Sequence, residues 1–286
     1  MSTVRGRTPR AKGGVVTTSN DKQNDAKERS VILAVAVPRE HGGWGLTLEP
    51  GLLGMLLVPG VAGLYLALAA LVGFLARTPL RLVLVDLHRG RSLERTQVAR
   101  WVTAGEFVVF AALVAAALEV GKGRFWVPSL VAGPLVVVAF SFEMRSRGRR
   151  LVPELAGSVG ICSVASSVVL ADGGGVRLAI GAWIVLGARA VTSIPHVRAM
   201  IARLHARPQS ARLGVLADGT AAVAAVAAVC LDHALILGAA AVLLVIVIQR
   251  LSSRLPVARP VVLGARQTVM GLGVVAATAI GVHLFH

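Results

Sequence analysis

The sequence RLGVLADGTAAVAAVAAVCLDHALILGAAAVLLVIVIQR, residues 212–250, decides the fold class of this chain. It contains two apolar stretches, 213–231 and 233–249, which are separated by Asp232 and flanked on their outer ends by arginines. Helices of this length, with a little flanking sequence, span a hydrocarbon core of about 30 Å. The pattern therefore predicts two membrane-spanning helices joined by a tight turn.

The same pattern extends over most of the chain. Seven further apolar stretches occur at 43–58, 60–76, 101–119, 126–142, 153–171, 176–194 and 267–284. Of the 30 Lys and Arg residues, 26 lie before the first stretch or in alternate gaps after it, and Arg189 lies five residues before the end of the stretch 176–194, which precedes one of these gaps. Because loops rich in Lys and Arg stay in the cytoplasm, the N-terminus is predicted to be cytoplasmic and the C-terminus outside.

These features predict an all-α, polytopic transmembrane helical bundle of about nine spans in the plasma membrane. The hydrophobic content of 55% and the mean hydropathy of +0.74 exceed those of ordinary soluble proteins. Residues 38–286 form the predicted membrane domain. Residues 1–37 are predicted to be a disordered, basic cytoplasmic tail, because their first 29 residues are polar and charged.

The net charge of +16 does not indicate a nucleic-acid partner. The arginines are distributed by membrane side rather than gathered on one domain, so membrane lipids are the expected partners. Cys162 and Cys230 both fall inside predicted spans, and the chain has no CxxC sequence, which argues against disulfide and zinc sites. The oligomeric state does not follow from the sequence.

Four ionisable residues fall inside predicted spans at a similar depth: Glu49, Glu106, Arg189 and Asp218. Each lies five or six residues from the predicted cytoplasmic end of its span, which is about 8 Å. Charges in this position are costly and are functional hypotheses by default. Two interpretations stay open: a cavity that opens to the cytoplasm, or a pairing of Arg189 with Glu49 or Glu106 that holds helices together.

The segment Pro38-Arg39-Glu40-His41-Gly42-Gly43-Trp44-Gly45 precedes the first span. Arg39 is suited to bind an anionic group, and His41 is suited to proton transfer near neutral pH. We therefore predict His41 and Glu40 as the catalytic acid and base if the protein is an enzyme, with Arg39 as a ligand-binding residue. A helix entry with an arginine that reaches the membrane surface is the alternative.

Two cytoplasmic gaps contain amphipathic segments. In the first, Leu80, Val83, Leu84 and Leu87 recur at helical spacing after Thr78 and Pro79; in the second, Val197, Met200, Ile201 and Leu204 do so after Pro195. Each segment is predicted to be a short helix that lies in the membrane interface with its arginines toward the headgroups. Because the segments follow spans two and six, a repeated four-span unit remains possible.

Residues Pro38–Trp44 resemble the signature P-R/K-E-H-G-x-W of the YwiC-like family of bacterial membrane proteins. The segments Arg77–Arg91 and Ser193–Arg198 also resemble that family, and His196 lies in the second of them. The resemblance covers about residues 38–210. It implies a membrane protein but no activity.

The architecture also resembles that of the UbiA-type prenyltransferases, which have nine spans and long inner loops after spans two and six. That resemblance implies Mg²⁺ and a prenyl diphosphate held by aspartate-rich motifs in the two loops. Here the first loop retains only Asp86 and Glu94, and the second has no acidic residue between Arg189 and Arg212. Since Mg²⁺ prefers carboxylate oxygens, a metal cofactor is poorly supported and none is evident.

The function we expect is the binding of an anionic small molecule or lipid-like ligand, phosphorylated or prenylated, at a cytoplasm-facing site within the membrane. An enzymatic activity, that of a divergent prenyltransferase-like transferase, is left open. The ligand-binding residues predicted are Arg39, Glu49, Arg77, Arg81, Asp86, Glu106, Arg189, His196 and Arg198. Two alternatives remain: a transporter of a small anion or metabolite, and a non-catalytic membrane scaffold.

Overall fold

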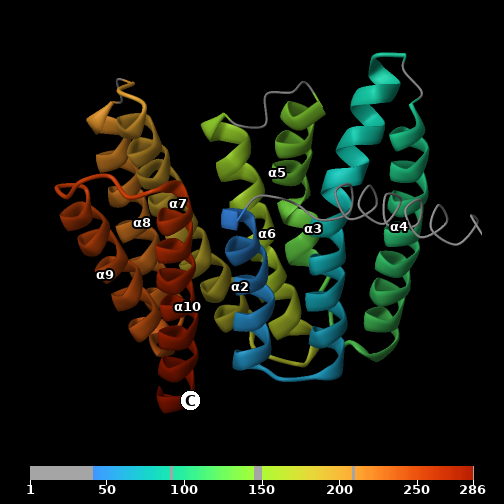
Figure 1. Ribbon diagram of the computed structural model, residues 1–286. Coiled ribbons are helices and arrows are strands. Elements are labelled where there is room, and N and C mark those ends of the chain that lie inside the picture. The colour runs from blue at the N-terminus through green and yellow to red at the C-terminus, as the bar shows by residue number, and fades with distance from the viewer. Residues whose placement is uncertain (1–40, 91–92, 145–149, 208–209, 286) are drawn as a thin grey trace, which may run out of the picture.

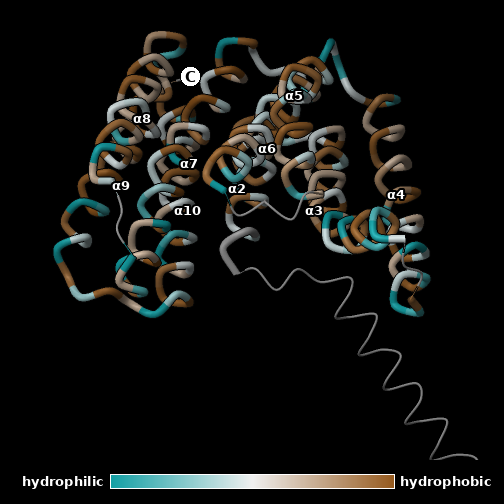
Figure 2. The backbone as a smooth tube through the Cα atoms, turned by 90° about the horizontal axis from the view of Figure 1, so that it is seen from above, coloured by the Kyte–Doolittle hydropathy of each residue, from teal (hydrophilic) through white to brown (hydrophobic). Residues whose placement is uncertain are grey.

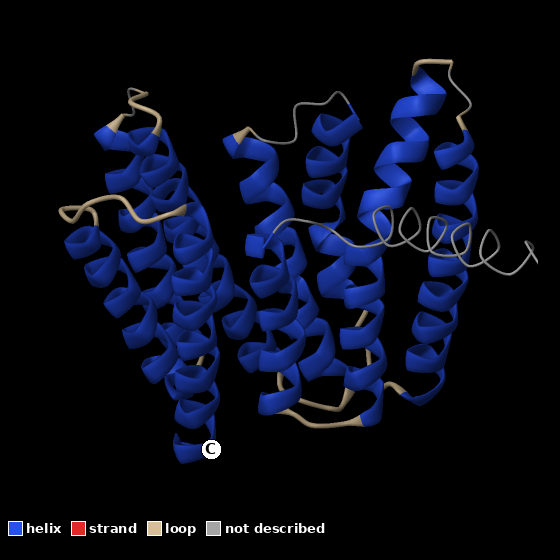
Figure 3. Cartoon of the chain, in the orientation of Figure 1, coloured by secondary structure: helices blue, strands red, loops and turns tan. Residues whose placement is uncertain are grey.

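The computed structural model describes residues 41–90, 93–144, 150–207 and 210–285. In these ranges the chain forms only helices and connecting loops (Figure 3). The predicted tail, Arg39 and Glu40 lie outside them. The helices are α2 (His41–Leu57), α3 (Val61–His88), α4 (Glu94–Val120), α5 (Val127–Met144), α6 (Leu151–Ala171), α7 (Val176–Leu204), α8 (Ala211–Leu231), the short 3₁₀ helix η1 (His233–Leu235), α9 (Ile236–Ser252) and α10 (Pro260–Phe285).

The prediction of a polytopic helical bundle is confirmed. Each predicted apolar stretch corresponds to one long helix. Among the described residues, eight helices are long and apolar enough to cross a membrane, with η1 and α9 forming one of them. Helix α2 has 17 residues and a similarly apolar sequence, and it contains the first predicted span.

The helices run alternately up and down, so the loops gather at two sides of the bundle (Figure 1). We call the side that carries the arginine-rich gaps, including Arg77–Arg100 and Arg189–Arg212, the basic side. The other side carries short connections and the end of α10. Seen from above, helices α7 to α10 form one group, α3 and α4 lie at the opposite edge, and α2 and α6 lie between (Figure 2).

Helix α6 is central to this arrangement, because it contacts α2, α3, α5 and α7. Helix α7 is also largely buried, whereas α4 lies at the edge and packs chiefly against α3. The main apolar core joins α2, α6, α7, α8, α9 and α10 through residues such as Leu53, Val185 and Val275. Residues of α2 and α7 are therefore held inside the bundle, while α4 presents most of its surface outward.

The two amphipathic segments differ from the prediction. They are not separate helices in the interface but the last turns of α3 and α7, which run unbroken past Pro79 and Pro195. A proline inside a helix removes one hydrogen bond and can kink the helix, but neighbouring helices can hold it in place. Thr78 is consequently an interior residue of α3. The helix ends at His88, and Gly90, two residues later, has a φ of +63°.

On the side opposite the basic side, Asp172 fixes the start of α3. Its Oδ2 accepts a hydrogen bond of 2.7 Å from the backbone N–H of Gly63 in the first turn of α3. A side chain at Gly60 would overlap the same carboxylate, so glycine allows the close approach. An acceptor at a helix N-terminus satisfies an otherwise unpaired donor and is favoured by the helix dipole.

We expect Asp172→Ala to lower the free energy of unfolding by about 1 kcal/mol, because the first turn of α3 then loses its acceptor. Thermal unfolding of the purified protein measures this change. Glu119→Ala is the matched control, since Glu119 is an exposed carboxylate on the same side. Equal midpoints for the two variants would contradict a structural role of Asp172.

Candidate functional site

A buried ion pair joins α2 and α7. Arg189 Nη2 lies 3.1 Å from Glu49 Oε1, and both side chains are 3% exposed. The same Nη2 donates a hydrogen bond of 2.6 Å to the backbone carbonyl of Gln267 in α10. Three helices therefore meet at this pair, which lies at the middle of α2 and α7.

Glycines make room for the Glu49 carboxylate. A Cβ at Gly271 of α10 would overlap Glu49 Oε1 and lie 2.6 Å from Arg189 Nη2. A Cβ at Gly45 of α2 would lie 3.4 Å from Glu49 Oε1 and 3.1 Å from Thr268 Oγ1. The backbones of α2 and α10 approach the carboxylate closely because these positions carry no side chain.

The ion pair leaves hydrogen-bonding capacity unused. Among the described residues, neither Arg189 Nε nor Glu49 Oε1 has a hydrogen-bond partner, although both atoms are buried. The 3.1 Å separation of Glu49 Oε1 and Arg189 Nη2 is short enough for an ion pair but lacks the alignment of a hydrogen bond. Buried charges are costly unless their bonding capacity is filled, so the pair is an energetically unfavourable element of the core.

Gln249 of α9 connects helices α7 and α10 beside this pair. It is 2% exposed, and its Nε2 donates to Ser193 Oγ at 3.0 Å and lies 3.4 Å from Gln267 Oε1. The hydroxyl of Thr192 lies 3.1 Å from Gln249 Oε1. The buried amide therefore has partners at both of its polar atoms.

Asp218 of α8 continues these contacts toward the protein surface. Thr192 Oγ1 donates to Asp218 Oδ1 at 2.5 Å, and Arg250 Nε pairs with Asp218 Oδ2. Arg250 is 47% exposed at the basic-side end of α9. We call the connected set the polar network; it consists of Glu49, Arg189, Thr192, Ser193, Asp218, Gln249, Arg250 and Gln267.

Two further ion pairs fix the basic-side ends of four helices. Arg77 Nε of α3 donates to both oxygens of Glu143 in α5, at 3.0 and 2.9 Å. Arg198 Nη1 of α7 donates to Glu154 Oε2 in α6 at 2.8 Å. Both arginines were predicted to bind the ligand. In the structure each pairs with a carboxylate beside the loop that joins α5 and α6.

The remaining predicted residues lie apart from the polar network. Asp86 is buried and accepts a hydrogen bond of 2.6 Å from Thr96, so it ties the end of α3 to the start of α4. Glu106 lies on the peripheral α4, where its Oε2 is buried without a hydrogen-bond partner in the described part of the chain. Arg81 is exposed one turn beyond Arg77.

His196 and His41 complete the predicted set. His196 is partly buried on α7, one turn beyond Thr192 of the polar network. His41 is the first residue of α2. Of the nine residues predicted to bind a ligand, the structure thus brings Glu49 and Arg189 into direct contact.

Six residues of the ion pairs and the polar network were not predicted: Glu143, Glu154, Thr192, Gln249, Arg250 and Gln267. The available signal was weak, since each lies within a few residues of the end of an apolar stretch. Polar residues at such positions are equally expected at a membrane surface. In the described ranges, no group of three or more His, Cys, Asp or Glu side chains has an arrangement that could hold a metal ion.

The sequence of the first five helices relates the chain to a known family. Residues 37–169 match the family model of the YwiC-like proteins. This part of the chain is YwiC-like. The match confirms the predicted resemblance over these residues and includes Glu49, Arg77, Glu143 and Glu154, whereas Arg189 and the segment Ser193–Arg198 lie beyond it.

The other comparisons give no relatives. No curated protein and no solved structure matches the chain. The architectural resemblance to UbiA-type prenyltransferases is not confirmed. The chain is therefore a helical protein with helices suited to cross a membrane, and it is similar to the YwiC-like proteins over residues 37–169.

Proposed function

We propose that this YwiC-like membrane protein binds an amphiphile with an oxyanion headgroup, a phosphate or a carboxylate, through Arg189 in the predicted cytoplasmic half of the membrane. One observation carries the proposal. Arg189 is a fully buried guanidinium whose Nε has no hydrogen-bond partner in the described chain. A buried arginine with unused donors matches the geometry of an oxyanion, which accepts two parallel N–H bonds.

Glu49 has a defined role in this proposal. Its carboxylate balances the charge of Arg189, and an incoming oxyanion competes with it for the guanidinium. Gly45 and Gly271 let the backbones of α2 and α10 pack closely against the carboxylate. The arginines of the basic side, including Arg81 and the half-exposed Arg77, raise the local concentration of anions. The catalytic roles of His41 and Glu40 stay predictions.

The experiment measures ligand-induced stabilisation of the purified protein. Candidate ligands are alkyl phosphates, farnesyl diphosphate with and without Mg²⁺, and anionic lipids. A ligand that binds the native state at 100 times its Kd raises the apparent stability by about 2.7 kcal/mol. We expect a phosphate-bearing amphiphile to stabilise the wild-type protein and to have no effect on the double variant Glu49→Gln/Arg189→Gln.

The double variant is the informative one, because it removes both charges and leaves a neutral pair that can fold. Glu49→Gln alone keeps the guanidinium and removes its competitor, so its stabilisation by the ligand should equal or exceed that of the wild type. An unchanged response of the double variant would remove Arg189 from the binding site. A shift that requires Mg²⁺ and is lost in Asp86→Ala would favour the prenyltransferase-like alternative.

Transport is the alternative predicted from the sequence, and no feature of the described helices favours it. Transport often uses helices that are broken near the midplane, and α5 runs unbroken through Pro134. In the polar network, Asp218, Gln249, Arg250 and Gln267 lie near the basic-side ends of α8, α9 and α10, whereas Glu49 and Arg189 lie at the middle of α2 and α7. Ligand flux into proteoliposomes would favour transport over ligand binding as the function.

A further inference from the structure

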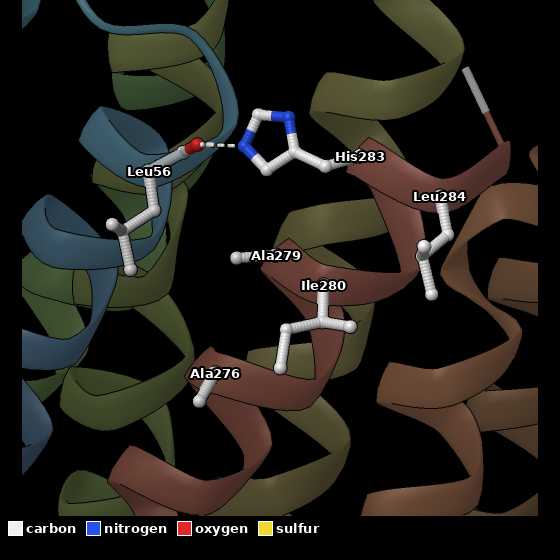
Figure 4. Close-up of a pocket in the computed structure, with 6 residues that line it drawn as sticks. All are labelled: Leu56, Ala276, Ala279, Ile280, His283 and Leu284. Carbon is white, nitrogen blue, oxygen red and sulfur yellow. Dashed lines mark hydrogen bonds between the residues drawn. The ribbon is translucent and has the colours of Figure 1, made fainter.

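An apolar hollow of about 410 Å³ lies between α2 and α10, away from the basic side. Its lining residues are Leu56, Ala276, Ala279, Ile280, His283 and Leu284 (Figure 4). All but Ala279 are exposed, so the hollow opens outward along the helices that face the membrane. Leu56, His283 and Leu284 place the hollow at the last turns of α2 and α10.

The hollow lies on the same seam as the Arg189–Glu49 pair. Gly45 faces Thr268 across the seam between α2 and α10, and both helices run from the basic side to the opposite side. Leu56 follows Gly45 by eleven residues, and Ala279 follows Thr268 by eleven residues. Eleven residues are close to three helical turns, so each later residue shares a face with the earlier one.

A hydrogen bond confirms this register. His283 Nε2 lies 2.8 Å from the backbone carbonyl of Leu56, which joins the far ends of the two helices beside the hollow (Figure 4). The seven residues from Glu49 to Leu56 correspond to a distance of about 10 Å along α2. One continuous seam therefore connects the buried charges to the hollow.

Gly273 leaves free space on the surface of α10, one to two turns before the hollow. A Cβ at Gly273 would have no heavy atom within 4 Å. Gly273 precedes Ile280 of the hollow by seven residues, close to two helical turns, so the two lie on one face of α10. The space at Gly273 lies on the exposed side of α10, whereas Gly271, two residues earlier, faces the Glu49–Arg189 pair on another side of the helix.

We propose that the hollow holds the hydrocarbon tail of the ligand whose headgroup binds Arg189. This inference rests on the proposed function and narrows it to amphiphiles with a single chain at least about 10 Å long, directed away from the basic side. The lining is apolar apart from the His283 ring, which is already bonded to Leu56, so the hollow offers its occupant contacts with carbon. The test distinguishes the ligand tail from two other occupants of the hollow, namely a bulk lipid and a second copy of the protein.

The test compares butyl, octyl and dodecyl phosphate with the protein in nanodiscs of neutral lipid. We expect dodecyl phosphate to bind at least about tenfold more tightly than butyl phosphate, which cannot reach the hollow. Ala276→Phe fills the hollow from an exposed position and should remove this preference while leaving butyl phosphate binding unchanged. Ala227→Phe is the matched control, an exposed alanine on α8 far from the seam.

A second variant covers the case in which Ala276→Phe fails to fold. Ile280→Ala enlarges the hollow and should improve the binding of hexadecyl phosphate relative to octyl phosphate. Equal dodecyl phosphate binding by Ala276→Phe and Ala227→Phe overturns the tail site, as does an unchanged chain-length profile in Ile280→Ala. If the tail site is overturned but butyl phosphate still binds and this binding depends on Arg189, the proposed function stands. If neither butyl phosphate nor the longer alkyl phosphates bind, both the tail site and the proposed function are overturned.

Discussion

Arg189→Gln is expected to lower the free energy of unfolding by about 3–5 kcal/mol, the largest effect among the single substitutions considered. The substitution leaves the carboxylate of Glu49, which is 3% exposed, without a counter-charge in the membrane interior. Glu49→Gln should cost nearly as much, because the guanidinium then keeps only the carbonyl of Gln267 as a described partner. Unfolding by denaturant in detergent, followed by circular dichroism, measures both.

The double variant Glu49→Gln/Arg189→Gln should recover most of the loss. Replacement of a whole buried ion pair by neutral side chains is often close to neutral, since the cost of removing two charges from water disappears with them. The coupling energy, obtained from the wild type, the two single variants and the double variant, therefore separates charge compensation from packing. If the double variant were as unstable as the sum of the single variants, the two residues would not form a pair in the folded protein.

The positions of the spans could be predicted from the sequence, and the lateral order of the helices could not. Apolar stretches such as 126–142 and 153–171 agree closely with α5 and α6, because helix length and hydropathy are local properties. The depth of Glu106 and Asp218 was likewise predicted from local sequence, namely from their distance to the end of an apolar stretch. Yet Asp218 joins the polar network and Glu106 lies on the peripheral α4, since the neighbours of a helix are set by tertiary packing.

The extension of α3 and α7 past their prolines shows a second limit of prediction from the sequence. An amphipathic helical repeat after Pro79 or Pro195 predicts a helix, but it does not distinguish a helix that turns into the interface from one that continues straight. The choice depends on contacts elsewhere: Arg77 with Glu143, Arg198 with Glu154, and Asp86 with Thr96. The contacts of Asp86 and Arg198 link the extended parts of α3 and α7 to other helices, and that of Arg77 lies two residues before Pro79.

Gly271→Ala is the second substitution with a large expected effect, about 1–3 kcal/mol of lost stability. The added methyl group would overlap the Glu49 carboxylate and lie 2.6 Å from Arg189 Nη2. Side-chain ends can usually move away from such a contact. Here the carboxylate is buried and paired, so movement away from Gly271 weakens the ion pair. The midpoint of thermal unfolding measures the loss.

Gly273→Ala supplies the control, because it makes the same change on the same helix at a position with no atom within 4 Å. It should leave stability unchanged or raise it by up to about 1 kcal/mol, because alanine has a higher helix propensity than glycine. The cause of the Gly271 effect can then be tested in a Glu49→Ala background, where the overlapping carboxylate is gone. There Gly271→Ala should add little further loss, because neighbouring substitutions that act on one contact are not additive. An undiminished loss in that background would place the conflict in the backbone packing of α2 against α10 and not in the Glu49–Arg189 pair.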